Sequence, residues 1–219
     1  MRKFFLSSLV VLLPQLTQAQ IILDSFKPGY YQLSDNRLSV YKGKLKVRLD
    51  ELITKDEQGN VKRFKPEEVY YVKTASSKRY MPASGFPLPA TTLFQGDKTA
   101  KPTLVELLDS GQVKLMRYAT IVAGAPMMNA GGGMSYSGSS TKAVYLLQRA
   151  DESEPVSLPS AGISGNGQKF LDALMPYVKS RPDLTLLLIK KRVSVKHLAD
   201  FIHALNTGQP FAPTTASNF

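Results

Sequence analysis

The chain has 219 residues and no cysteine, which excludes disulfides, thiolate nucleophiles and cysteine-bound zinc. Hydrophobic residues make up 43% and charged residues 21% of the sequence, a balance typical of a globular protein rather than a disordered one. Lys and Arg outnumber Asp and Glu by 28 to 17, a formal net charge of +11. A basic surface attracts polyanions, although such a charge can also serve solubility alone, without a specific partner.

Residues 1–19 have the features of a secretory signal peptide. A basic start is followed by an apolar stretch over residues 4–13, and Thr17 and Ala19 put small residues at the −3 and −1 positions of a cut after Ala19. A spanning helix needs roughly 20 apolar residues, so this run is too short for an anchor. We therefore expect cleavage near Ala19, export to the periplasm or out of the cell, and no transmembrane anchor in the mature chain.

Export would change which polyanions the chain meets, and cleavage would change its net charge. Loss of Arg2 and Lys3 lowers the net charge from +11 to +9. Outside the cytoplasm, lipid phosphates, lipopolysaccharide and acidic glycans take the place of nucleic acid as the available polyanions. We expect no nucleic-acid partner.

Residues 20–150 are predicted to be rich in β-strands. The clearest signal is an alternation over residues 38–49, which puts Gly43, Leu45, Val47 and Leu49 on one face and Lys42, Lys44, Lys46 and Arg48 on the other. Further strands are expected over residues 21–26, 30–33, 61–64, 69–72, 78–81, 111–119 and 143–149, with 104–108 as a strand or a short helix. Turns or loops are expected at 28–29, 34–36, 55–60, 83–102 and 123–140, and one helical turn at 65–68.

Residues 151–208 are predicted to form the helical C-terminal part of the same domain. A linker over 151–168 leads to a helix over 169–178 that Pro176 should bend or end, and a second helix over 183–191 follows, with Pro182 at its entry. Ser194 is a good N-cap for a third helix, which ends near Gly208, and residues 209–219 are expected to form a flexible tail. The order predicts an α+β fold, with a mostly antiparallel β-sheet in the N-terminal two-thirds and a small C-terminal helical segment packed on it.

The usual catalytic and metal-binding motifs are incomplete. The glycines at 131–133 lack the rest of a phosphate-binding loop, Ser135 lacks the last glycine of a hydrolase elbow, and Ser139 opens an S-x-x-K pattern without its companion motifs. His197 and His203 are six residues apart and point in directions about 120° apart on a helix, so they cannot share a metal. We expect two surface histidines, no metal and no cofactor. The sequence neither supports nor excludes a pair of glycosidase carboxylates that face one another across a cleft.

Lys42, Lys44, Lys46 and Arg48 form the one patterned feature of the predicted surface. Alternate residues of a strand lie about 7 Å apart, so the four cations form a row that could dock an anionic surface. The alternative is an ordinary solvent-facing strand whose lysines guard a sheet edge against aggregation.

A series of short motifs occurs in one order along the chain. It consists of PGYY at 28–31, GKL at 43–45, RFKPEEV at 63–69, GQVKL at 111–115, YLL at 145–147 and YVKSRPDL at 177–184. This series resembles a group of uncharacterised exported proteins of Bacteroidetes-type bacteria, over roughly residues 28 to 206. The aromatic residue usual near the end of the last helix is missing after Asn206. The resemblance implies export and a β-rich region followed by helices, but no activity and no role for any residue.

Together these patterns predict an exported, non-enzymatic binding module of the bacterial envelope. An anionic envelope component or a partner protein is the expected ligand, and the oligomeric state is left open. The alternative is an envelope hydrolase, which would need a pocket with at least two convergent polar groups of perturbed ionisation.

Overall fold

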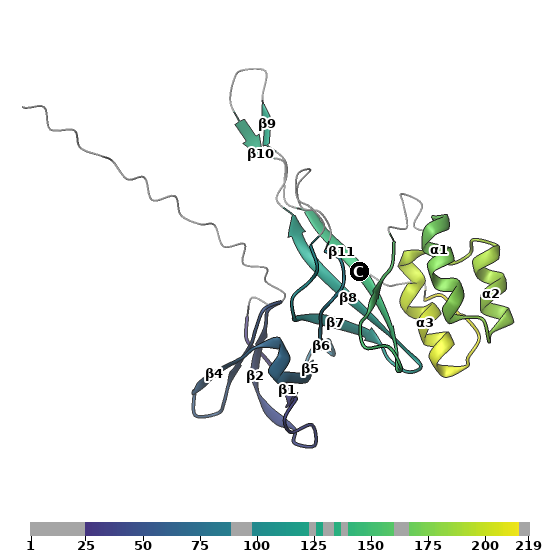
Figure 1. Ribbon diagram of the computed structural model, residues 1–219. Helices are drawn as coiled ribbons and strands as arrows, with labels where there is room; N and C mark the ends of the chain where they lie inside the picture. Colours follow the sequence, from purple (N-terminus) through teal and green to yellow (C-terminus); the bar gives the residue numbers. More distant parts are fainter. Residues whose placement is uncertain are drawn as a thin grey trace, which may run out of the picture.

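The computed structural model describes residues 25–88, 98–122, 126–128, 134–136, 140–159 and 167–214. Most of its strands form one ten-stranded sheet with the order β12-β11-β8-β7-β6-β5-β1-β2-β3-β4, and all neighbouring pairs are antiparallel (Figure 1). The helices follow in the last third of the chain. The predicted α+β fold is thus confirmed.

The strands of the sheet are β1 (Lys27–Leu33), β2 (Tyr41–Val47), β3 (Leu52–Lys55), β4 (Val61–Phe64), β5 (Val69–Thr74), β6 (Arg79–Ala83), β7 (Thr103–Asp109), β8 (Val113–Val122), β11 (Ser140–Arg149) and β12 (Val156–Ser157). A separate two-stranded ribbon pairs β9 (Pro126–Met128) with β10 (Met134–Tyr136). The α-helices are α1 (Gln168–Leu174), α2 (Pro182–Ile189) and α3 (Leu198–Thr207), and short 3-10 turns are η1 (Pro66–Glu68), η2 (Met175–Tyr177) and η3 (Val195–His197).

Most of the expected strands are present where the alternation of side chains placed them. In β2, Leu45 and Val47 are fully buried, whereas Lys42 and Lys44 are exposed. Residues 65–68 contain the helical turn η1, and residues 104–108 belong to the strand β7. Of the strand expected over residues 21–26, residues 21–24 lie outside the described part, and Ser25 and Phe26 do not belong to a strand.

Several local expectations were wrong. The loop expected over residues 123–140 contains the strands β9 and β10, and β3 was not predicted. Pro28 and Gly29 do not form a turn but lie inside β1, where the carbonyl of Pro28 accepts a hydrogen bond from Ala75 N–H at 2.7 Å. A Cβ at position 29 would collide with the carbonyl oxygen of Lys73, so Gly29 lets the neighbouring strand approach. The linker predicted over 151–168 contains the two-residue strand β12, which pairs with β11. The strand at Pro28 and Gly29 comes from pairing with a strand far along the chain, and β12 comes from pairing with the preceding strand β11.

The N-terminal half of the sheet curls on itself. The carbonyl of Leu49, just after β2, accepts hydrogen bonds from Leu104 N–H at 2.8 Å and from the Thr103 hydroxyl at 2.7 Å, both in β7. Strands β1, β5 and β6 lie between β2 and β7 in the sheet order, so this contact requires a strong curvature. The curled half encloses a core of Tyr31, Leu45, Val47, Leu52, Val69, Val72, Tyr80 and Leu104.

The helices cover one face of the other half of the sheet (Figure 1). Side chains from α1, α2 and α3 pack on Val113, Leu115 and Leu147 of β8 and β11. Pro176 lies in η2, where the chain leaves α1, and α2 begins at Pro182, so both predicted effects of proline are confirmed.

The start of the last helix differs from the prediction. Ser194 takes the N-cap position of η3 rather than of an α-helix, and its side chain forms no capping hydrogen bond. Gly208, with φ of 74°, ends α3 as expected. Of the expected flexible tail, residues 211–214 contact α3: Phe211 packs edge-on against Phe201, and Thr214 N–H donates to Asp200 at 2.9 Å. Residues 215–219 lie outside the described part.

Candidate anion-binding face

Strand β2, which carries three of the four predicted cations, lies in the interior of the sheet. It pairs with β1 on one side and with β3 on the other. Lys42 and Lys44 are exposed and Lys46 is partly exposed, all at alternate positions of the strand. Because β2 is not an edge strand, protection of a sheet edge does not explain these lysines.

Neighbouring strands add further cations to the same surface. Residues directly opposite in a ladder point to the same side of the sheet. Lys55 of β3 lies opposite Lys44, and Tyr30 of β1 lies opposite both Lys42 and Lys73. In the next ladder Arg79 of β6 lies opposite Lys73. We call this surface the lysine face and define it by Lys42, Lys44, Lys46, Lys55, Lys73, Arg79 and Tyr30.

Like charges that face one another repel, and two such pairs occur here. They are Lys44 with Lys55 and Lys73 with Arg79. The second pair is partly accommodated, because the Arg79 guanidinium donates to the Leu108 carbonyl at 2.7 Å and the Lys73 ammonium lies 5.8 Å from the centre of the Tyr30 ring. A cation over an aromatic ring is stabilised by the electrons of the ring. Among the described residues neither of these two pairs has a carboxylate within ion-pairing distance, so positive charge remains at these positions of the lysine face.

Arg48 is the fourth predicted cation. It lies beyond the last residue of the strand, and its guanidinium contacts the Glu51 carboxylate at 2.8 Å. The same carboxylate also binds Arg63 at 2.8 Å. Arg48 thus belongs to an ion-pair cluster at the end of the lysine face, where one carboxylate offsets part of its charge.

The additional residues of the lysine face show what a single sequence leaves undetermined. Lys55 falls in a polar segment that we expected to be a hairpin loop, and Lys73 lies just after a predicted strand. Only the register between β1, β2, β3 and β5 brings them beside Lys42 and Lys44. The alternation within each strand predicts which of its own side chains are exposed, but not which strands lie next to one another on the surface.

Each histidine lies near a different carboxylate, but His197 Nδ1 forms no hydrogen bond to its neighbour. His203 Nδ1 lies 2.8 Å from Asp109 Oδ2, at the end of β7, and His197 Nδ1 lies 3.7 Å from Asp200 Oδ2. No cluster of three His, Cys, Asp or Glu that could hold a metal occurs among the described residues. The partner of His203 is 94 residues away in sequence, so the sequence could not indicate it.

The candidate nucleophiles cannot be assigned to a site. Ser139 and the glycines at 131–133 lie outside the described residues, and Ser135 lies in β10 on the separate ribbon. Within the described parts of the chain, no helix has both the length and the apolar character needed to cross a membrane.

Comparisons with known proteins add no relative. No protein-family model matches the chain, and neither a curated protein nor a solved structure matches it. The resemblance to exported proteins of Bacteroidetes-type bacteria therefore stays a prediction. The functional proposal below is based on the geometry of the lysine face.

Proposed function

We propose that the protein is an exported, non-catalytic binding module that attaches through its lysine face to an anionic component of the bacterial envelope. The observation that carries this proposal is the pairing of Lys44 with Lys55 on adjacent strands of the sheet. Like charges directly opposite one another destabilise a sheet. A bound anion would offset that repulsion, so the arrangement favours a protein with an anionic ligand.

The charge of the surrounding segment supports the same proposal. Residues 25–83, which span β1 to β6, contain 13 Lys and Arg against seven Asp and Glu. This excess exceeds half of the +9 expected for the mature chain. An uneven distribution of charge steers anions toward one region more strongly than the same charge spread evenly.

Export determines which anion is available. The proposed signal peptide would deliver the chain to a compartment that holds lipid phosphates, lipopolysaccharide and acidic glycans. These ligands present rows of negative charge rather than a single charged group. A row of lysines on a sheet fits such a ligand better than it fits a small metabolite, which is usually held in a pocket.

A pull-down from envelope extract tests this proposal. The immobilised protein should retain an anionic component at low salt and release it at high salt, because ions screen exposed charges over about 10 Å at 0.1 M and about 3 Å at 1 M. Retention that survives high salt would point to a partner held by apolar contacts. If nothing is retained above background at low salt, the proposed function is wrong.

A further inference from the structure

A cavity that is separate from the lysine face lies beside residues 98–103. Its volume is about 560 Å³, and its lining includes Leu49, Leu88, Ala100, Pro102 and Tyr118. Small-molecule sites commonly enclose about 300–1,000 Å³. None of the lining residues belongs to the lysine face. The size and the apolar character of this cavity therefore suit a small ligand rather than a polymer.

Hydrogen bonds between residues 86–88 and 98–100 hold one wall of the cavity in place. The backbone pairs Leu88 N–H with Lys98 C=O at 2.7 Å and Ala100 N–H with Phe86 C=O at 2.8 Å. Phe86 is fully buried, and its ring packs edge-on against that of Tyr118, with the ring centres 5.4 Å apart. The cavity is thus bounded by fixed backbone on one side and by the strand β8 on the other.

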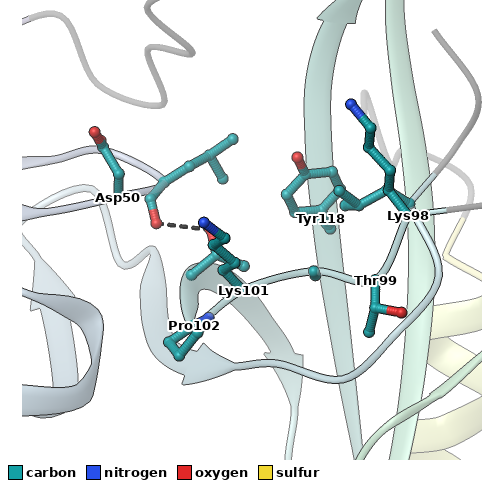
Figure 2. Close-up of a pocket in the computed structure, with 10 residues that line it drawn as sticks. Asp50, Lys98, Thr99, Lys101, Pro102 and Tyr118 are labelled. Carbon is teal, nitrogen blue, oxygen red and sulfur yellow. Dashed lines mark hydrogen bonds between the residues drawn. The ribbon is translucent and has the colours of Figure 1, made fainter. Parts of the chain in front are cut away.

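The polar groups around the cavity carry a small positive excess. Lys98 and Lys101 contribute two ammonium groups and Asp50 one carboxylate. Figure 2 shows Asp50 on one side of the pocket and Tyr118 with Lys98 on the other. The two cations and one anion leave one net positive charge beside an apolar wall. That combination matches a ligand with an apolar body and one negatively charged head.

We propose that this cavity binds an anionic amphiphile, meaning a small molecule with an apolar body and a single carboxylate or phosphate head. Leu49, Leu88 and Pro102 would contact the apolar body. Lys98 and Lys101 would attract the head and repel a cationic competitor, whereas Asp50 offsets part of their charge. This inference does not depend on the lysine face, so either proposal can fail without the other.

Tryptophan fluorescence provides a direct test, because the chain contains no Trp. The variant Thr99→Trp places one reporter at an exposed position of the lining. Titration with decanoate and decyl phosphate, below the concentrations at which they form micelles, should give a saturable change in emission. Decyltrimethylammonium should not, because its head is cationic. The two anions separate a carboxylate site from a phosphate site, and binding of either one supports the proposal.

Variants in the Thr99→Trp background identify the groups responsible. Lys98→Gln with Lys101→Gln should weaken binding of the anion about tenfold, equivalent to about 1.4 kcal/mol. Ala100→Phe should abolish it by filling the cavity, since Ala100 is 6% exposed and lines the wall. Lys190→Gln, at an exposed position on the end of α2, is the matched control and should have no effect.

Two further measurements distinguish loss of binding from loss of folding and from an effect of the Trp reporter. Circular dichroism of each variant shows whether it is folded, and saturation-transfer NMR of decanoate with the unsubstituted chain shows binding without the Trp reporter. The variant Lys42→Gln with Lys44→Gln should bind decanoate normally. Absence of saturable binding by the unsubstituted chain, or equal binding of decanoate and decyltrimethylammonium, would overturn the proposal.

Discussion

Lys44 on β2 and Lys55 on β3 lie directly opposite one another, and both side chains are exposed. Opposite residues in an antiparallel pair have Cβ atoms about 4.5–5.5 Å apart, so the two ammonium groups repel when no anion lies between them. If this surface binds anions, stability and affinity should respond in opposite directions when one of the two charges is reversed.

Lys44→Glu tests that relationship. It converts the repulsive pair into an attractive one, so the free energy of unfolding should rise by about 0.2–1 kcal/mol. Urea denaturation measures the change, with Lys190→Glu as a control at an exposed helix end. Retention of anionic envelope material should fall in Lys44→Glu alone. A decrease in stability would show that Lys44 takes part in a favourable contact that outweighs its repulsion by Lys55.

The fold was more predictable than the surface. Leu45 and Val47 alternate with lysines in one strand, and period-two burial follows from the geometry of that strand alone. Pro28 and Gly29 were misassigned because their turn propensity is a local property, whereas the strand is imposed by β2 and β5 on either side. Register and curvature depend on such long-range pairing.

The same limit applies to the sites. Lys42, Lys44 and Lys46 could be predicted as one row because they share a strand. Lys55 and Lys73 could not, because no pattern within one strand fixes its register with the next. The cavity lined by Leu49 and Tyr118 joins segments almost 70 residues apart, and no motif marks it.

Asn206 connects the last helix to the sheet. Its side-chain oxygen accepts from Val113 N–H at 2.9 Å, and its side-chain nitrogen donates to the Val113 carbonyl at 2.8 Å and to Asp109 at 2.6 Å. Asn206→Ala should lower the free energy of unfolding by about 2 kcal/mol, because it removes three partly buried hydrogen bonds. Urea denaturation again provides the measurement.

Asn206→Asp sharpens this test. It keeps an acceptor for Val113 N–H but places a second carboxylate beside Asp109 and the Val113 carbonyl, so it should be at least as destabilising as Asn206→Ala. Gln168→Ala is the control, since it removes one exposed hydrogen bond to Asp172. If both Asn206 variants unfold like the natural chain, the helices do not depend on this contact.

Tyr80 predicts how stability changes at alkaline pH. It is fully buried, and burial followed by the nearby charge of Glu106 raises the pKa of Tyr80 above its ordinary value of 10.0. The unfolded chain releases this proton above about pH 10 while the folded chain retains it, so stability present below that pH is lost as the pH rises. Each such group contributes up to about 1.4 kcal/mol per pH unit.

Tyr80→Phe should therefore make the free energy of unfolding fall less steeply above about pH 10. At neutral pH the variant should be no less stable, because the buried hydroxyl has no hydrogen-bond partner among the described residues. Urea denaturation across the pH range measures both effects, and Tyr70→Phe, at a site 41% exposed, is the control. An unchanged alkaline slope in Tyr80→Phe would contradict the assignment.

Export gives a prediction for the N-terminus. Mass spectrometry of the protein secreted by a bacterial host should find a chain that begins at Gln20, because signal peptidase cuts after a small residue. Ala19→Arg should leave the precursor uncleaved, whereas Ser7→Ala, in the apolar stretch, should be processed normally. A secreted chain that begins at Met1 would mean that residues 1–19 are not a cleaved signal.

The central claim is that the location of the lysines, and not the total charge, determines binding. Two double variants separate these causes, because each changes the net charge by four: Lys42→Glu with Lys44→Glu on the lysine face, and Lys169→Glu with Lys190→Glu at exposed positions on the helices. Sedimentation with lipopolysaccharide or with anionic phospholipid vesicles at low salt measures the affinity of each. The lysine-face variant should lose about tenfold or more in affinity, and the helix variant should change little. An equal loss in both would contradict the central claim, because net charge alone would then explain the binding.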